Sequence, residues 1–310
     1  MASLIITCNT NPDLDRFACA FAYQEFLSKT GQEAAMVIFG APHEEVNYLL
    51  NRFNIVFPQN NVNELSPASQ IVLVDTSDLR GLDKKINPEK VIEVIDHRQI
   101  NDQHLFPKAK IQIELVGACA TLMAERYRQQ GLMPSLQSAI LIYGAIVSNT
   151  LNFKANTTTE RDRAVANWLV ENFDLPENLA QEMFLAKSDL GGKRLQQKIR
   201  HDFAWFEFIG QRVGVAQIEM MGGRDLLEQR LNEISSELAE LKSELLLDFV
   251  FLSIVELKED INIFVALDEK TRKMLVGIFD LKFVFRQATR PGLIMRKEIA
   301  PLIKAYLENN

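Results

Sequence analysis

Short, unbroken apolar runs alternate with helix-like segments through the first part of the chain, and this alternation constrains the fold more than any other feature. Helical spacing of apolar residues follows the first, second and last of these runs. Apolar strands that alternate with helices indicate a parallel sheet with helices on both faces. We therefore predict an α/β fold with strands at residues 3–8, 35–40, 71–75, 91–96 and 110–115.

A second structural unit is predicted after the helical segment at residues 134–186. The Gly pair in KSDLGGKR interrupts two well-formed blocks and marks a linker. Beyond it, we predict three strands (RVGVAQIEM, DFVFLSIVEL and INIFVAL), a long amphipathic helix at residues 225–244 and a final helix after a basic turn, which together indicate a smaller α/β domain. We predict a first domain at residues 1–188, a linker at 189–195 and a second domain at 196–310.

Length and charge agree with two globular domains. The 310 residues exceed the usual size of one hydrophobic core, and 47% hydrophobic with 24% charged residues is an ordinary globular composition. The net charge of -7, without a long Lys/Arg cluster, argues against stable nucleic-acid binding. A local basic pocket in such a protein can still hold a small phosphate.

The cysteines and the apolar segments bear on the cellular compartment. Cys8, Cys19 and Cys119 have no zinc-type spacing, so neither a disulfide framework nor a structural zinc is expected. The chain has no uninterrupted apolar run of about eighteen residues, and its N-terminus has no basic leader. We therefore predict a cytoplasmic protein without membrane association.

Acidic residues and a histidine follow three of the predicted strands. Asp13 and Asp15 lie in the turn NTNPDLD, Asp75 ends the third run, and Asp96 and His97 follow the fourth. Taken alone, the first motif is more typical of a solvated turn. Its repetition at the sheet edge where such folds bind ligands favours a common site. Carboxylates with a neutral imidazole suit Mn, Mg, Zn or Fe, and a shared carboxylate such as Asp75 can bridge two ions.

Two further segments allow a phosphate-binding and a purely structural interpretation. The sequence GACAT, at residues 117–121, opens a helix with small residues, which suits either close approach of a phosphate or tight packing of the helix on the sheet. Arg296 and Lys297 precede an apolar helix, and their charge pattern alone is more typical of a solvated pair. Both interpretations stay open for each segment.

Six motifs, in this order, resemble those of one family. They are NPDLD, LVDTSD, IDHR, GACAT, AIVSNTLNFKANTTT and MRKEIAPLI. Together they span nearly the whole chain and resemble the DHH phosphoesterase superfamily, specifically its two-domain branch of manganese-dependent family II inorganic pyrophosphatases and cytosolic exopolyphosphatases, including prune-like proteins. The resemblance implies a DHH domain and a smaller domain with an active-site cleft between them, and it allows a homodimer.

The resemblance also implies roles for individual residues. The implied cofactor is Mn²⁺ or Mg²⁺, as one or two ions. The implied metal-ligand positions are Asn9, Asp13, Asp15, Asp75, His97 and Asn149. The implied catalytic residues are Asp13, Asp15, Asp75, His97 and Arg98. The implied phosphate ligands are Arg98, Arg296 and Lys297. Asp96 is implied to orient the site.

Four positions depart from the pyrophosphatase pattern. Asn9 replaces a His ligand, as in exopolyphosphatases and prune-like proteins, and Arg98 replaces the second His of the DHH motif, as in prune-like proteins. Asn149 replaces an Asp ligand, which lowers the negative charge that two dications need. Ala204 stands near the place of a phosphate-binding Lys. We therefore expect weakened metal binding and reduced activity.

Three functions compete. The main hypothesis is a metal-dependent phosphohydrolase, similar to inorganic pyrophosphatases and exopolyphosphatases, that cleaves phosphoanhydride bonds of pyrophosphate or short polyphosphate with a metal-activated water. The alternative is a catalytically impaired DHH-family protein that binds a phosphorylated ligand or a partner protein. A nuclease for very short oligonucleotides is disfavoured, because the sequence lacks the Gly-rich C-terminal signature of those members.

Overall fold

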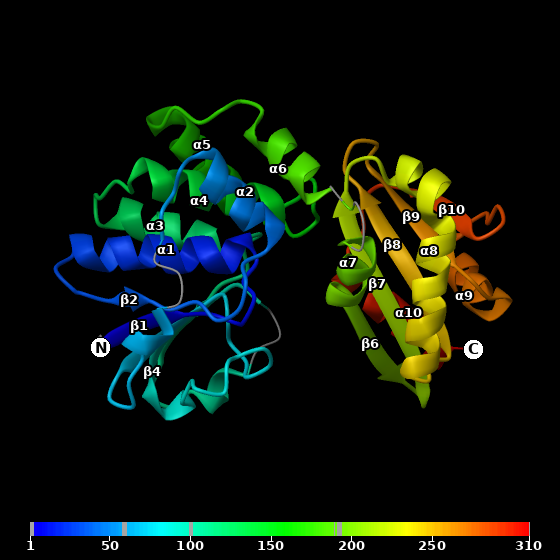
Figure 1. Cartoon of the computed structure of the whole chain (residues 1–310), viewed down its shortest axis with the longest axis horizontal. Coiled ribbons are helices and arrows are strands. Elements are labelled where there is room, and N and C mark those ends of the chain that lie inside the picture. Colours follow the sequence, from blue (N-terminus) through cyan, green and yellow to red (C-terminus); the bar gives the residue numbers. More distant parts are fainter. Residues whose placement is uncertain (1–2, 58–60, 99–101, 189, 191–193, 310) are drawn as a thin grey trace. The chain divides into compact units, whose positions relative to one another are not determined.

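The chain forms two compact units (Figure 1). The structure, a computed structural model, describes residues 3–57, 61–98, 102–188, 190 and 194–309. The first unit comprises Met1–Ala186 and the second Lys187–Asn310. Of the predicted linker, residues 189 and 191–193 lie outside the described residues, and its last two residues already belong to helix α7 (Arg194–His201). The predicted domain boundaries therefore stay predictions.

Five parallel strands form the sheet of the first unit, in the order β2-β1-β3-β4-β5. The strands are β1 (Leu4–Thr7), β2 (Ala35–Met36), β3 (Gln70–Val74), β4 (Val91–Asp96) and β5 (Lys110–Ile113). The predicted α/β class is confirmed, although β2 is shorter than its apolar run. Because all strands run in one direction, the carboxyl ends of β1, β3 and β4 lie side by side at one edge.

The α-helices of the first unit cover one face of this sheet (Figure 1). They are α1 (Leu14–Lys29), α2 (Glu44–Arg52), α3 (Cys119–Gln129), α4 (Leu136–Asn149), α5 (Glu160–Asn172) and α6 (Leu179–Lys187). Apolar side chains such as Ile6 and Val72 point into this helical layer, and the successive strand residues Ile5 and Ile71 face the opposite side.

The second face of the sheet departs from the prediction of helices on both faces. Its covering consists of loops and short 3-10 helices, namely η1 (Asn61–Glu64), η2 (Pro88–Lys90) and η3 (Gln103–Leu105). Phe106 and Ile86 pack there against strand residues such as Leu73. The connection between β3 and β4 contains Gly81, at φ +80°, and Pro88, which favour turns over a continuous α-helix.

The second unit contains a mixed sheet in the order β10-β9-β8-β7-β6, in which β7 and β8 are the parallel pair. The strands are β6 (Phe203–Phe208), β7 (Gln211–Met220), β8 (Phe249–Glu256), β9 (Ile261–Ala266) and β10 (Gln287–Pro291). The helices are α7, α8 (Gly223–Glu244), α9 (Glu269–Phe279) and α10 (Arg296–Glu308). Separate apolar clusters lie on the two faces of this sheet, one with α7 and α8 and one with α9 and α10.

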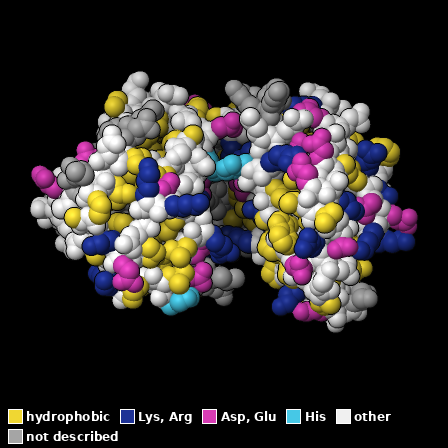
Figure 2. Space-filling model, turned by 60° about the horizontal axis from the view of Figure 1, so that its bottom comes forward, with side chains coloured by type: hydrophobic (Ala, Val, Ile, Leu, Met, Phe, Trp, Pro, Cys, Tyr) yellow, Lys and Arg dark blue, Asp and Glu magenta, His cyan; other side chains and the backbone are white. Residues whose placement is uncertain are grey.

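On the face drawn in Figure 2, the described Lys and Arg side chains are interspersed with acidic and apolar ones in each unit, without a broad basic surface. Among the described residues, none of the helices combines the length and the hydropathy that a membrane span needs.

Candidate active site

Three of the predicted metal-ligand side chains meet at the carboxyl edge of the parallel sheet. One ligand atom each of Asp15, Asp75 and His97 lies within 4.8 Å of the others. Asp15 stands in the first turn of α1, Asp75 directly follows β3, and His97 directly follows β4. Nε2 of His97 lies 3.4 Å from Oδ1 of Asp75 and 3.8 Å from Oδ2 of Asp15. The structure thus brings three of the predicted ligands together.

The ring of His97 is oriented by the backbone. Its Nδ1 lies 2.8 Å from the carbonyl oxygen of Val116, which can only accept, so Nδ1 carries the proton and Nε2 faces the two carboxylates. The turn is held by the fully buried Asp96, whose Oδ1 accepts hydrogen bonds from the N–H groups of His97, at 2.7 Å, and Arg98, at 3.3 Å. Burial and the nearby Asp75 charge raise the pKa of Asp96. Asp96 is therefore placed to orient the histidine, the role implied by the resemblance.

Asp15 is fixed by the N-terminus of α3. Its two carboxylate oxygens accept hydrogen bonds from the N–H groups of Cys119 and Ala120, each at 2.8 Å. Asn149, the last residue of α4, donates a third from Nδ2 at 2.5 Å. Burial and the charge of Asp75 raise the pKa of Asp15 to about 7, which the bond from Ala120 opposes. Asn149 presents an N–H group to this site, so its role as a carbonyl ligand stays a prediction.

The two oxygens of Asp75 face different partners. Oδ1 faces His97, is buried and has no hydrogen-bond partner among the described residues. Oδ2 lies 3.4 Å from Nε of Arg16 and 3.8 Å from Nη2 of Arg98. Burial raises the pKa of Asp75, but the nearby His97 and the two arginine charges hold it below its ordinary range. Asp75 also has a left-handed backbone, with φ 45°, and its N–H donates to the carbonyl of Ile95. Such strained positions occur frequently at functional sites.

Asp13 lies outside the three-residue group, although the sequence treats it as a ligand equal to Asp15. It is the N-cap of α1, where an acidic side chain accepts from free helix N–H groups. Oδ1 accepts from the N–H of Arg16 at 3.0 Å, and Oδ2 lies 2.9 Å from Nη1 of the same residue. The role of Asp13 as a metal ligand stays a prediction that this arrangement does not favour.

Arg16 is the site residue that sequence reasoning missed. Its guanidinium contacts both Asp13 and Asp75. Burial lowers the pKa of Arg16, but the two carboxylates outweigh this effect, and the net shift is upward. The side chain is therefore a permanent cation. The sequence feature that could have revealed it is an arginine directly after the acidic motif NPDLD. It stands three residues after the helix cap Asp13, a spacing that brings the two side chains together.

Arg98 is engaged by the acidic turns around it. Nη2 donates to the carbonyl oxygen of Asp75, Nη1 lies 3.5 Å from Asp78, and Nε lies 3.5 Å from Asp96. The arginine thus ties the turn after β3 to the turn after β4. One quarter of its side chain is exposed, and its predicted phosphate contact stays a prediction.

Asn9 also carries an unpartnered oxygen near these turns. Its N–H donates to Oγ1 of Thr76 at 3.2 Å, which ties the loop after β1 to the loop after β3. Oδ1 is buried and has no hydrogen-bond partner among the described residues. A carbonyl oxygen in that condition is available to a cation. The predicted ligand role of Asn9 is compatible with this environment.

The segment GACAT has a structural role in this arrangement. The N–H groups of Gly117 and Ala118 donate to Asp162, at 2.8 and 3.4 Å, and those of Cys119 and Ala120 donate to Asp15. A Cβ added at Gly117 would lie 2.6 Å from Cγ2 of Thr150. Carboxylates of the chain therefore occupy the helix N-terminus, and tight packing, rather than phosphate binding, explains the small residues.

Arg296 and Lys297 begin α10 in the second unit. Basic residues are unfavourable at the positive end of a helix dipole, so their position calls for other partners. The N–H of Arg296 donates to Oε1 of Gln217 at 2.5 Å, and its Nη1 donates to the carbonyl of Asp202. Burial lowers the pKa of both residues. Their predicted phosphate contact stays a prediction.

Ala204, the position near which the family carries a phosphate-binding Lys, lies in β6, paired with Val215.

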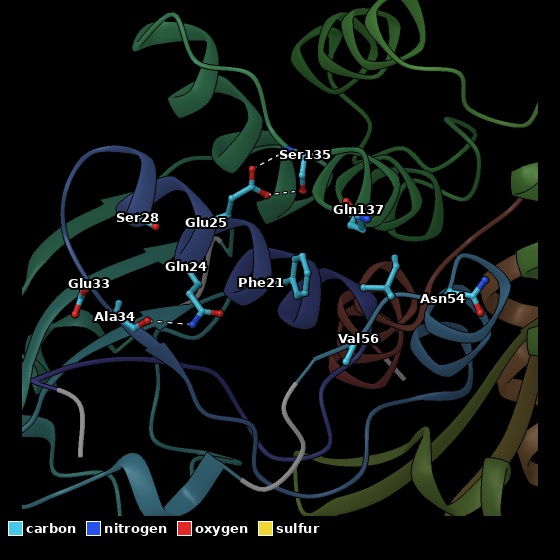
Figure 3. A pocket seen from close by; sticks show the side chains of 11 residues that line it. Phe21, Gln24, Glu25, Ser28, Glu33, Ala34, Asn54, Val56, Ser135 and Gln137 are labelled. Carbon is cyan, nitrogen blue, oxygen red and sulfur yellow. Dashed lines mark hydrogen bonds between the residues drawn. The ribbon is translucent and has the colours of Figure 1, made fainter.

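A hollow in the first unit lies apart from this group. Its volume is about 880 Å³, and α1, the segments next to β2 and α2, and the start of α4 line it (Figure 3). Glu25 on its wall accepts hydrogen bonds from the backbone N–H and the hydroxyl of Ser135, both at 2.7 Å. None of the predicted site residues lines it. The candidate site is therefore the three-residue group at the strand ends.

Comparison with known proteins agrees with this geometry. Residues 181–306 match the DHHA2 domain family. The chain is 28% identical over 305 residues to a protein of Clostridium acetobutylicum described as a probable manganese-dependent inorganic pyrophosphatase, with 97% of both chains covered. A Bacillus cereus protein with the same description is 27% identical over 307 residues, with 98% of both covered.

Solved structures show the same architecture. The crystal structure of a Methanococcus jannaschii protein assigned to the family II inorganic pyrophosphatases matches with a TM-score of 0.76 and 25% identity, over 98% of this chain and 99% of that one. An exopolyphosphatase-related protein of Bacteroides fragilis, at a TM-score of 0.54 and 10% identity over 99% and 92% of the two chains, shares the fold. The chain is therefore a full-length homologue of the manganese-dependent family II inorganic pyrophosphatases of the DHH phosphoesterase superfamily, with a DHHA2 domain in its second unit.

Proposed function

We propose that the chain is a metal-dependent phosphohydrolase that cleaves phosphoanhydride bonds, with pyrophosphate or short polyphosphate as its substrate. The observation that carries the proposal is the group of Asp15, Asp75 and His97 at the carboxyl edge of the sheet. It occurs in a chain whose full-length relatives are described as manganese-dependent inorganic pyrophosphatases.

The donor set fits Mn²⁺. Two carboxylates and one imidazole are ligands that this ion accepts readily. Oδ1 of Asp75 is buried without a hydrogen-bond partner among the described residues, an unfavourable state that a cation would relieve. The bond from Nδ1 of His97 to Val116 leaves the lone pair of Nε2 directed at the same point. Asp15, Asp75 and His97 would hold the ion, and Mg²⁺ is the alternative.

The chain's own residues prepare the site for hydrolysis. When bound, the ion supplies the charge that activates a water and stabilises the phosphoryl oxygens. The α3 amides keep Asp15 in place, Val116 and Asp96 orient His97, and Arg98 braces the backbone of Asp75. Ligands fixed in this way need little reorganisation during the reaction.

A catalytically impaired ligand-binding protein is the second candidate. Two observations favour it: Asn149 presents an N–H group where an acidic ligand is expected, and Arg98 is occupied by acidic turns. The predicted cytoplasmic location, the homodimer and the lack of nucleic-acid binding stay predictions beside either candidate.

Phosphate release from pyrophosphate and tripolyphosphate, measured with Mn²⁺ and with Mg²⁺, separates the two candidates. We expect release by the wild type, and a loss of at least about 100-fold in kcat/KM for Asp15→Asn and His97→Ala, because even outer-shell partners of a metal cost about 10- to 100-fold. Glu160→Gln, a change at a side chain 96% exposed, is the matched control and should keep full activity. Binding of pyrophosphate by calorimetry, without release under any of these conditions, would establish the impaired binder instead.

A further inference from the structure

We infer that Arg16 takes the place of a second metal ion, so that this centre binds one divalent cation beside a fixed guanidinium. The inference rests on the proposed metal-dependent function and specifies its metal content. Nη1 of Arg16 lies 2.9 Å from Oδ2 of Asp13, and its Nε lies 3.4 Å from Oδ2 of Asp75. The guanidinium therefore joins two carboxylates in the way that a bridging cation would.

Asp75 has only one oxygen left for a metal. A carboxylate that bridges two ions gives one oxygen to each. Oδ1 of Asp75 faces His97 and is unpartnered, whereas Oδ2 faces the guanidinium groups of Arg16 and Arg98. Asp75 can thus serve a single ion on its His97 side, and the bridging role predicted from the sequence does not fit this arrangement.

Both oxygens of Asp13 are engaged by the cation of Arg16 or by its backbone. Oδ1 caps the helix through the N–H of Arg16, and Oδ2 pairs with Nη1 of the same residue. Because Asp13 and Arg16 are one turn apart on α1, the helix itself keeps the pair together, and the Arg16 side chain is only 20% exposed. The oxygens that a second ion would need are therefore held by one partly buried arginine.

The formal charges agree with one ion. Asp13, Asp15 and Asp75 carry three negative charges, and Arg16 with one dication carries three positive charges. A second dication would have to lie against the partly buried guanidinium of Arg16, and two cations in contact repel strongly where water is largely excluded. Arg98 does not alter this sum, because Arg98 and Arg80 together balance the further carboxylates of Asp78 and Asp96.

A guanidinium differs from a metal ion in what it can do. It supplies permanent charge and directional hydrogen-bond donors, but it does not coordinate a water molecule and does not lower its pKa as a metal ion does. Water activation would therefore depend on the ion at Asp15, Asp75 and His97 alone. Arg16 would act as a positioning residue that keeps Asp75 oriented whether or not the metal site is filled.

Metal stoichiometry tests the inference. The full chain is stripped with a chelator and titrated with Mn²⁺, with calorimetry to count ions and electron paramagnetic resonance to detect magnetic coupling. The wild type should bind one Mn²⁺ per chain, with the spectrum of an isolated ion. Arg16→Met, which keeps most of the side-chain length and removes the charge, should bind two ions and show an exchange-coupled pair. Arg126→Met removes a guanidinium that is paired with Glu93 at 2.9 Å and is 14% exposed, elsewhere in the same unit, and should still bind one.

The outcomes separate this inference from the proposed function. Two coupled ions in the wild type would overturn the inference and leave the metal-dependent hydrolase intact. No bound ion in the wild type would overturn both. A folded Arg16→Met variant that still binds a single ion would also overturn the inference, because Asp13 would then lack ligand character for another reason. If Arg16→Met does not fold, the wild-type stoichiometry and spectrum still decide.

Discussion

At the scale of single residues, one arginine distinguishes two carboxylates that sequence spacing treats alike. Asp13 and Asp15 belong to one motif and were predicted to bind metal together. Asp15 points toward the amides of α3, whereas Asp13 caps its own helix and pairs with Arg16. The turn motif and its position at the strand end could be predicted from sequence. The division of roles could not, because it depends on the N-terminus of a helix more than a hundred residues away.

The different roles of these two carboxylates predict different effects of the same substitution. Asp15→Asn should weaken Mn²⁺ binding by about 100-fold or more, because it removes a ligand charge. Asp13→Asn should change the affinity far less, since asparagine also caps helices and the residue lies outside the ligand group. Calorimetric titration of both variants, with circular dichroism to verify folding, measures the contrast. Equal losses of affinity in the two variants would contradict this assignment.

At the scale of secondary-structure elements, Asp162 joins the starts of two helices. Its carboxylate accepts hydrogen bonds from the N–H of Gly117, at 2.8 Å, from the hydroxyl of Thr121, at 2.6 Å, and from the N–H of Thr159, at 2.7 Å. The side chain is buried and serves α3 as well as its own helix α5. The small residues at the start of α3 could be recognised from the sequence. That the carboxylate of Asp162, and not a phosphate, accepts hydrogen bonds from this helix start could not.

Removal of this carboxylate should be costly for stability. Asp162→Ala leaves several buried donors without acceptors, each worth about 1 to 3 kcal/mol, so the free energy of unfolding should fall by about 3 kcal/mol or more. Glu160→Ala, two residues earlier on the same helix and exposed, should change it by less than about 0.5 kcal/mol. Urea unfolding measures both, and similar small changes in the two variants would refute the structural role of Asp162.

The contact between α1 and α4 depends on pH through Glu25. Burial raises the pKa of Glu25, but hydrogen bonds from Ser138 and Ser135 and the contact with Lys29 lower it below its ordinary value of 4.5. Because the folded pKa lies below the unfolded one, the carboxylate stabilises the fold above about pH 4.5, and this contribution is lost as the pH falls through the folded pKa. The stability should thus be sensitive to mild acid.

Replacing Glu25 with the neutral Gln tests this pH dependence of the stability. At pH 7, Glu25→Gln should lower the free energy of unfolding by about 1 to 2 kcal/mol, because hydrogen bonds to a charged acceptor are lost. The gap between wild type and variant should narrow as the pH falls below about 4.5. Urea unfolding at several pH values between about 3.5 and 7 measures the gap. A gap that stays constant over this range would show that the charge of Glu25 does not contribute.

At the scale of the whole molecule, sequence patterns predicted every strand of the first sheet but only the interior strands of the second. The alternation of apolar runs and helices predicted the first sheet, and the buried strands β7, β8 and β9 were recognised in the second. The edge strands β6 and β10 were missed. β6 is nearly all aromatic and apolar although partly exposed, and β10 contains Arg290 and Pro291. Such edges are specified by hydrogen bonds to a neighbouring strand rather than by their own periodicity.

Each unit has its own apolar core, and each contains one of the two tryptophans of the chain, Trp168 in α5 and Trp205 in β6. Trp168→Phe and Trp205→Phe therefore leave a fluorescent reporter in one unit at a time. Ligands stabilise only the unit that binds them, by about 2.7 kcal/mol at 100 times the dissociation constant. We expect Mn²⁺ to raise the unfolding free energy reported by Trp168 by this amount and to leave the value from Trp205 within about 0.5 kcal/mol. Introducing Asp15→Asn into the variant that retains Trp168 should abolish this increase in its unfolding free energy. An equal increase at both tryptophans would show instead that the two units unfold together.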